Sequence, residues 1–455
     1  MLALNVAPDA SSSKTTLTTR SAEHAALKRP HARRTTTWQS LLSVTVLAAA
    51  TAFTGLAQAD EGEGGGAVRL LKTIPIPGTP LRGFDISWVD AATQTYYLAD
   101  RSNAAVDVVD AKTGTYVKRL TGGFAGVKFN ANNTANNALS GPNGVTSSGR
   151  WLFVTDAGSR VVTIDLTTGL VVSSVVTSPS PNRADELAYD SHDGTLLVIN
   201  NADEPPFGTL ISVNKSTGQL TVGAKIIFDA AHAGFNATSG AEQPVWDPEA
   251  RKFYLSIPEI NCTGPTCGGG GATGAVVQID PHSTGHVDAV FPVQHCQPAG
   301  LTLGPKDHLL IGCGVPFDTA GVAWTATDAA TAAPVSIVLN AHNGAVVATV
   351  AGVSGSDEVW YNRGDGNYYL AARNNPGGPV LGVIDAKTNT LTQLVPTINT
   401  AGKTTAPPFP SGTAHSVAAN PHNNWVFVPL PANNVFPSCL NGCIAVYASP
   451  ERHDD

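Results

Sequence analysis

A unit of four short apolar runs repeats along most of this 455-residue chain. Its clearest copy spans 356–397, where the runs DEVWY, NYYLAA, VLGVID and TLTQLV are separated by turn sequences such as NRGDG and DAKTN. Gly, Asn and Asp favour turns because they tolerate the backbone conformations that tight hairpins require. Each copy therefore predicts four antiparallel strands, and their regular repetition predicts a repeat architecture.

Alignment of the first run of each copy gives seven units. These runs are GFDISWVD (83–90), GPNGVTSS (141–148), ADELAYD (184–190), AEQPVWD (241–247), PAGLTLG (298–304), SDEVWYN (356–362) and AHSVAAN (414–420). The seventh unit ends after its third strand at 443–448, and a spare strand, VRLLKTIPIP, lies at 68–77. Pairing the two would remove exposed sheet edges. The sequence therefore predicts an all-β fold over 68–450, a single seven-bladed β-propeller whose ring is closed by the N-terminal strand in the last blade.

Residues 1–59 have the features of a secretory signal peptide. Basic residues precede an apolar run at 41–56, and the run is followed by Ala57-Gln58-Ala59, an order typical of a cleaved leader. A membrane anchor is the alternative, but the run is shorter than the about 20 residues that a spanning helix needs. We expect cleavage after Ala59, a flexible linker at 60–67, a tail at 451–455, and a periplasmic or secreted protein with no membrane span after cleavage.

The chain without its leader is acidic. Its formal charge of −8 falls to −12 when residues 1–59, which carry six Lys and Arg and two Asp and Glu, are left out. An acidic surface repels phosphate backbones, so no nucleic-acid partner is expected. In an exported chain an even number of cysteines favours disulfides over a metal site. We expect three local disulfides: Cys262–Cys267, Cys296–Cys313 and Cys439–Cys443.

Several of the strands resemble known propeller repeats. The runs TYYLADRSN (95–103), WLFVTD (151–156) and VVTIDLTTG (161–169) resemble the YVTN-type repeats of exported bacterial proteins. GPNGV (141–145) and AGLTLGP (299–305) are similar to strands of the gluconolactonase/senescence-marker propellers. The first resemblance implies an exported β-propeller, and the second implies a cation held in the central channel.

The connections between strands differ in length on the two faces of the expected ring. Loops from the first to the second strand and from the third to the fourth lie on one face and are short. The remaining loops lie on the other face and contain six long insertions, at 122–140, 230–240, 261–273, 314–333, 399–412 and 431–442. Because long loops on a rigid scaffold concentrate function, we expect the site and any protein partner on this long-loop face.

Polar residues stand at the start of the first strand in six of the seven units, where buried strands usually carry Val or Ile. These starts surround the channel, so we expect one cluster at its mouth: Asp85, Asn143, Asp185, Glu186, Glu242, Asp357, Glu358 and His415. Grouped carboxylates raise one another's pKa unless a cation or an arginine lies nearby. Three alternatives remain open here: a divalent cation, a polar channel in which the acids pair with arginines, and a site for a polar substrate alone.

The resemblance to gluconolactonase-type propellers implies a metal-dependent hydrolase of lactone or ester type. In such enzymes the cation polarises a carbonyl group and a carboxylate activates water. The implied metal ligands are Asn143, Glu186, and Asp357 or Glu358. If the site is catalytic, we expect Glu186, Glu358 and His415 as its catalytic residues, with the spare carboxylate or His415 as the general base. Carboxylate and amide oxygens favour Ca²⁺ or Mg²⁺, whereas a histidine ligand admits Zn²⁺ or Mn²⁺.

The alternative function is a non-catalytic periplasmic or secreted binding protein. Its channel mouth would capture a small polar ligand, or its rim would dock a protein partner. Amides and acids at the ends of the second strands would add to the ring of polar groups. The expected ligand-binding residues are Asp85, Arg101, Asp185, Asn201, Glu242, Arg373 and Asn374.

Overall fold

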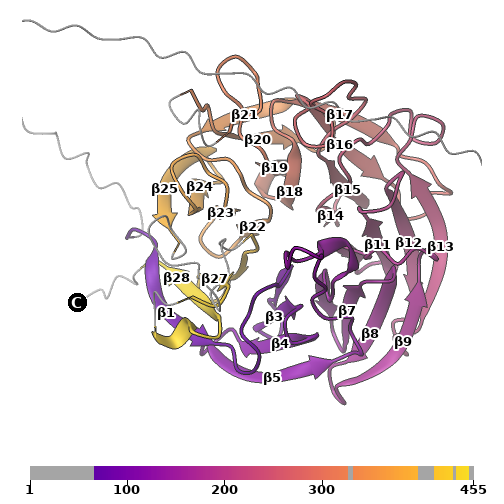
Figure 1. The fold of residues 1–455 in the computed structure, drawn as a ribbon, viewed down its shortest axis with the longest axis vertical. Coiled ribbons are helices and arrows are strands. Elements are labelled where there is room, and N and C mark those ends of the chain that lie inside the picture. Colours follow the sequence, from indigo (N-terminus) through magenta and orange to yellow (C-terminus); the bar gives the residue numbers. More distant parts are fainter. Residues whose placement is uncertain (1–65, 326–330, 398–414, 434–436, 450–455) are drawn as a thin grey trace, which may run out of the picture. The chain divides into compact units, whose positions relative to one another are not determined.

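The computed structural model describes residues 66–325, 331–397, 415–433 and 437–449. Within these residues the chain forms seven four-stranded antiparallel sheets in a ring, a seven-bladed β-propeller (Figure 1). The predicted fold class is confirmed. Helical structure in the described part is limited to the 3-10 turns η1 (Asn137–Leu139), η2 (Pro305–Asp307) and η4 (Pro437–Cys439). The predicted signal peptide and the tail lie outside the described residues, as does most of the linker.

The first three blades follow one another along the chain. Blade one contains β2 (Ser87–Asp90), β3 (Thr95–Asp100), β4 (Ala105–Asp110) and β5 (Thr115–Thr121). Blade two contains β6 (Val145–Ser148), β7 (Trp151–Asp156), β8 (Arg160–Asp165) and β9 (Leu170–Val176). Blade three contains β10 (Leu187–Asp190), β11 (Thr195–Asn200), β12 (Phe207–Val213) and β13 (Leu220–Ile227).

The next three blades have the same strand order. Blade four contains β14 (Pro244–Asp247), β15 (Lys252–Ile257), β16 (Thr273–Ile279) and β17 (Ala289–Gln294). Blade five contains β18 (Pro298–Leu303), β19 (His308–Cys313), β20 (Val335–Asn340) and β21 (Val346–Ala351). Blade six contains β22 (Val359–Asn362), β23 (Asn367–Ala372), β24 (Val380–Asp385) and β25 (Thr390–Pro396).

The last blade joins the two ends of the described chain. It contains β26 (Ala418–Asn420), β27 (Trp425–Leu430), β28 (Cys443–Ala448) and, as its outer strand, β1 (Arg69–Pro75). Strand β1 pairs antiparallel with β28, placing Arg69 opposite Ala448 and Pro75 opposite Cys443. Figure 1 shows this indigo strand beside the yellow one. The predicted closure of the ring by the N-terminal strand is therefore confirmed.

The apolar core of the described residues is divided into seven clusters, each between two neighbouring blades. Successive residues of a strand point to opposite faces of its sheet, so one strand feeds two clusters. In β27, Val426 and Val428 pack toward blade six, whereas Phe427 packs toward blade one. Burying one such side chain stabilises the fold by about 1.5–3 kcal/mol, so each blade depends on both of its neighbours.

Acidic and amide side chains close the hairpins between first and second strands. The Oδ1 atom of Asp90 accepts hydrogen bonds from the backbone N–H groups of Ala92, at 2.9 Å, and Thr93, at 3.1 Å. Asp190 and Asp247 close the equivalent turns of blades three and four in the same way. These side-chain contacts stabilise turns of only a few residues, so this face of the ring carries short connections.

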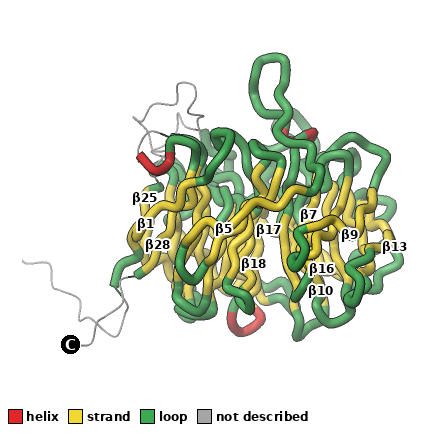
Figure 2. Tube along the Cα trace, turned by 90° about the horizontal axis from the view of Figure 1, so that it is seen from below, coloured by secondary structure: helices red, strands yellow, loops and turns green. Residues whose placement is uncertain are grey.

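The opposite face carries the longer loops. Figure 2 shows the ring edge-on, with longer loops projecting from one side. The connection between β5 and β6 is folded onto itself by bridges between Gly126 and Gly141 and between Phe129 and Ala135. The loop after β15 is held by a bridge between Ala237 and Ile260. These loops therefore have defined structure beside the start of each first strand.

All six cysteines form the predicted disulfides. The Cα atoms lie 5.5 Å apart in Cys262–Cys267, 4.5 Å apart in Cys296–Cys313 and 4.8 Å apart in Cys439–Cys443. The middle pair is bridged because it flanks the hairpin of β18 and β19, whose pairing sets Pro298 opposite Cys313. In the part of the chain that the structure describes, no helix has the length and hydropathy of a membrane span.

Candidate functional site

Most of the polar residues expected at the channel mouth do lie together. They line one cavity of about 120 Å³, with three arginines among them. Its ionisable lining residues are Asp85, Arg101, Arg183, Asp185, Glu186, Glu242, Asp357, Glu358, Arg373 and His415. The acids meet because each lies one or two residues before a first strand, β2, β10, β14 or β22, and these strands surround the channel (Figure 1).

Each aspartate of this cluster has an arginine partner. Arg101 forms a buried ion pair with Asp85, and the Nη2 atom of Arg183 lies 2.6 Å from Asp185 Oδ2. The third pair joins Arg373 Nη2 to Asp357 Oδ2 at 2.7 Å. The alternative in which the acids pair with arginines therefore holds for the three aspartates.

The two aspartates of the buried pairs titrate in opposite directions. Burial alone would raise the pKa of Asp85, but Arg101 and Arg183 outweigh it and lower that pKa. Burial raises the pKa of Asp185 to about 7 although Arg183 opposes the rise, and the neighbouring Asp85 adds to it. Asp85 is therefore ionised throughout the physiological range, and the charge of Asp185 changes near neutral pH.

The three glutamates have no arginine partner among the described residues. Glu358 shares a hydrogen bond with Glu186 and accepts another from Gln243 Nε2 at 3.0 Å. The side chain of Glu242 has no hydrogen bond within the described residues. Burial raises the pKa of each glutamate well above its usual value, and neighbouring carboxylates add to the rise, which Arg183 opposes at Glu242. Because a buried carboxylate is costly without a counter-charge, these glutamates either hold protons or face a cation.

Asn143 lies one layer away from the cavity and is fully engaged. Its Oδ1 atom accepts hydrogen bonds from Arg101 Nε at 3.0 Å and Nη2 at 2.8 Å. Its Nδ2 atom donates to the carbonyl oxygen of Ala184 at 2.8 Å. Ligation of a cation by Asn143 would require its oxygen to leave Arg101. The contacts in the structure instead use Asn143 to orient the guanidinium group that neutralises Asp85.

His415 lies at the cavity wall with its ring stacked on Phe84, at 5.1 Å between centroids. Its Nε2 atom is 3.2 Å from the carbonyl oxygen of Phe84, and its Nδ1 atom is 3.5 Å from Asp357 Oδ2. Burial, together with Arg373, lowers the pKa of His415. A neutral ring that donates Nε2–H to Phe84 leaves Nδ1 without a proton, so this atom is available as a base or a ligand.

The remaining predicted ligand-binding residues fall into two groups. Arg101 is only 3% exposed, and Asn201 accepts a hydrogen bond from Arg183 Nε at 3.2 Å, so both support the cluster. Arg373 and Asn374 instead line an adjoining cavity of about 270 Å³. The two cavities share Glu242, Asp357 and Arg373. The mouth therefore consists of a small acidic cavity beside a larger polar one.

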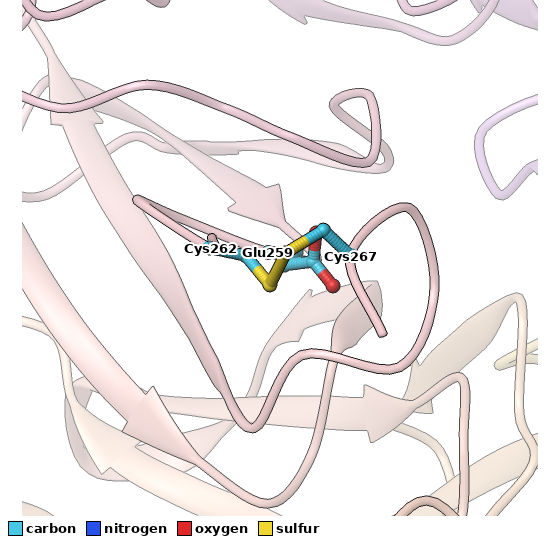
Figure 3. A group of neighbouring side chains, drawn as sticks. All are labelled: Glu259, Cys262 and Cys267. Atoms are coloured by element: carbon cyan, nitrogen blue, oxygen red, sulfur yellow. A yellow bond between two sulfur atoms is a disulfide. The ribbon is translucent and has the colours of Figure 1, made fainter. Parts of the chain in front are cut away.

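One group of possible metal ligands lies outside the mouth. Glu259, Cys262 and Cys267 have ligand atoms within 4.8 Å of one another, and in the described residues they form the only such group of three His, Cys, Asp or Glu (Figure 3). The two cysteines are joined in a disulfide and offer no thiolate. Glu259 accepts hydrogen bonds from the backbone of Gly268 and Gly271. Its carboxylate therefore anchors the disulfide loop. The acids at the mouth form no such close group within the described residues, so an ion there would contact them partly through water.

The ends of the second strands serve mainly to tie loops together. Asp100 accepts from the backbone of Asn103 at 2.9 Å, Asp156 pairs with Arg160 at 2.7 Å, and Asn200 accepts from Thr177 at 2.7 Å. Two further residues, Gln243 and Asn137, contact Glu358 and Arg101 and are not among the predicted site residues. Gln243 directly follows a predicted site residue, and its place at the strand start was the available signal.

Comparisons with known proteins support the fold alone. No protein-family model matches the sequence, and no curated protein matches it. Among solved structures, a chain of the hydrazine synthase of Kuenenia stuttgartiensis is 12% identical with a TM-score of 0.57, over 80% of this chain and 95% of that one. A chain from a mitotic checkpoint complex is also 12% identical, with a TM-score of 0.54, over 90% of this chain and all of the other.

Proposed function

We propose that the long-loop mouth binds a hydrated divalent cation together with a small polar molecule, and that the protein is an exported binding protein for that molecule. The observation that carries the proposal is the division of the acids. Three aspartates form ion pairs with arginines, whereas Glu186, Glu242 and Glu358 form none within the described residues, although Arg183 acts on Glu242 at longer range. A divalent cation supplies the positive charge that the buried Glu186 and Glu358 and the partly buried Glu242 lack.

The size of the acidic cavity favours an ion that keeps part of its water shell. A volume of about 120 Å³ holds about four water molecules at ~30 Å³ each. The ligand atoms of the acids are too far apart for a closely packed protein cage. Mg²⁺ usually keeps several waters, and Ca²⁺ accepts mixed shells of carboxylate and water oxygens. These two ions are therefore preferred over Zn²⁺ and Mn²⁺, whose binding would depend on His415.

The adjoining cavity sets the kind of molecule that is captured. Its volume of about 270 Å³ suits a small metabolite, and it opens beside Glu242, Asp357 and Arg373. A ligand there would present oxygen atoms both to the cation and to the guanidinium group of Arg373. Export is part of the proposal because three disulfides are typical of oxidising compartments.

A lactone or ester hydrolase is the second candidate, and the hydrogen-bonded pair of Glu186 and Glu358 favours it. Two carboxyl groups that share one proton provide a general acid and a general base side by side. The ionised partner would take a proton from the attacking water, and a cation held by these acids would supply Lewis-acid chemistry at the carbonyl group. Turnover of a lactone and ester panel that stops in chelator, and in Glu186→Gln, supports the hydrolase. Binding without turnover supports the binding protein.

Cation binding is tested by calorimetric titration of the protein with CaCl₂ and MgCl₂. We expect saturable binding, weakened at least about tenfold in Glu242→Gln and Glu358→Gln because each removes a carboxylate from the cavity. Glu249→Gln is the matched control, since Glu249 is exposed in a turn of the opposite face. Wild-type protein that binds neither ion would remove the cation from the proposal.

The stability of the cation-free protein should fall as the pH rises. The folded-state pKa values of Glu186, Glu242 and Glu358 are raised, so their favourable contribution is complete below about pH 4.5 and is lost as they ionise. Melting in chelator should therefore show a lower melting temperature at pH 8 than at pH 5. Glu358→Gln should melt at a higher temperature than wild type at pH 8, because it removes a carboxyl group that ionises there, and like wild type at pH 5. Equal melting at both values of pH would contradict the raised pKa values.

A further inference from the structure

Besides the two cavities at the long-loop mouth, the channel contains a cavity of about 600 Å³. The first strands of blades one to six line it, and it reaches the short turns at Ser191, Pro248 and Arg363. Ile86 and Glu186 line both this cavity and the acidic one. Glu186 therefore lies between the acidic cavity and this one.

Aromatic rings make up much of the wall of this cavity. The rings belong to the middle positions of β2, β10, β14 and β22, and each remains partly exposed inside the channel: Trp88, Tyr189, Trp246, Trp360 and Tyr361. We call this space the aromatic cavity. Its volume lies within the range of ordinary small-molecule sites, about 300–1,000 Å³.

The rings are fixed in place by contacts behind them. Trp88 donates its Nε1–H to Ser147 Oγ at 3.1 Å, and its ring meets Trp360 edge-on at 5.1 Å between centroids. Trp246 packs on Phe253 at 4.8 Å between centroids. The wall is thus preformed, which reduces the entropy that ligand binding would cost.

Three hydroxyl groups of the same wall are already engaged. Ser147 Oγ accepts from Trp88 and donates to Asp90, and Ser87 Oγ bonds to Ser416 Oγ at 2.8 Å. Thr302 Oγ1 accepts from the backbone of Tyr361 at 3.2 Å. The rings and the charge at the inner end are therefore the features of this wall that select a ligand.

The charge at the inner end is acidic. Glu186 lies there with 6% of its surface exposed, and Arg363, the only lysine or arginine among the residues that line the cavity, is exposed at the outer turn. We propose that the aromatic cavity binds an organic cation, a quaternary ammonium or protonated amine on an apolar body, with the rings around its charge and Glu186 at the inner end. Aromatic faces attract such cations, and a buried carboxyl group supplies the counter-charge.

This site is separate from the divalent-cation site except for Glu186, and the test uses that separation. Choline is titrated into the full chain in the presence of EDTA, and its binding is measured by calorimetry and by tryptophan fluorescence. Its uncharged isostere 3,3-dimethyl-1-butanol is titrated in parallel. We expect saturable binding of choline and at least tenfold weaker binding of the alcohol. Trp360→Leu and Glu186→Gln should each weaken choline binding at least tenfold, whereas Glu242→Gln should leave it unchanged, because Glu242 does not line the aromatic cavity.

Folding controls keep the test decisive. Each variant is first melted, and Trp246→Leu replaces Trp360→Leu if the latter does not fold. Trp425→Phe, a tryptophan outside the cavity, should bind choline like wild type. Choline that does not bind, or binds no better than the alcohol, overturns the proposal whatever the divalent cations do. Loss of Ca²⁺ and Mg²⁺ binding with choline binding intact contradicts only the cation at the long-loop mouth.

Discussion

Deletion of residues 66–77, which removes β1, is expected to lower the melting temperature by about 10 °C or more, or to cause aggregation. The deletion uncovers the edge of β28 along its whole length. It also removes Ile74 and Ile76, both almost completely buried between blades seven and one. An exposed strand edge and an opened core are both destabilising, because the edge invites pairing between molecules and the core gains contact with water.

Point substitutions in β1 separate the two causes. Ile74→Ser should destabilise the fold by about 2–4 kcal/mol, because it cuts into the core. Leu71→Ser, at a position that is 41% exposed, should cost less than about 1 kcal/mol. Thermal and urea unfolding measure both. A truncated protein that melts like the full chain would contradict the closure of the ring by β1.

Asp85→Asn is expected to destabilise the protein by about 3–5 kcal/mol, the usual cost of leaving a buried charge without its partner. Asp85 is the carboxylate that Arg101 and Arg183 share, and Arg101 is 3% exposed. Asparagine fills the same space but supplies no negative charge. Urea unfolding at pH 7 measures the loss, and the Asp85→Asn/Arg101→Gln double variant should recover part of it because the unpaired charge is gone.

Asp357→Asn is the matched control at the same mouth. Its partner Arg373 has a side chain that is 40% exposed, so water replaces the lost ion pair and the expected cost is below about 1 kcal/mol. Equal losses for Asp85→Asn and Asp357→Asn would contradict the structural role assigned to the Asp85–Arg101 pair.

The fold was predictable because its information is local and repeated. Each short strand is followed by a turn sequence, and Asp90 and Asp190 close their turns with the side-chain contacts that such residues favour. The closing strand was predictable because one unit lacked a strand that the other end of the chain could supply. The disulfides followed from short separations along the chain, 4, 5 and 17 residues.

The membership of the mouth was predictable from register, but its pairing was not. A shared position before each first strand places Asp85, Glu186 and Glu358 around one channel. Which acid meets which arginine depends on side-chain reach between blades, and this information is absent from the strand pattern. Arg101 reaches both Asp85 and Asn143, so an asparagine expected to bind a cation instead orients an arginine.

The aromatic cavity shows a second limit of the sequence pattern. Trp88, Trp246 and Trp360 are visible in the runs SWVD, PVWD and VWYN, where they read as ordinary strand residues. These rings surround one cavity because of the way the blades are rotated about the channel. The alternation of residues along a single strand does not reveal that rotation.

The central claim is that a divalent cation takes the place of protons on the unpaired glutamates, and proton release on binding tests it most directly. Calorimetric titration with CaCl₂ or MgCl₂ at pH 7, in two buffers of different ionisation enthalpy, gives the number of protons released per ion. The proposal predicts about one proton or more per bound cation, and a smaller number in Glu358→Gln. Binding without proton release, or no binding in either buffer, would contradict it.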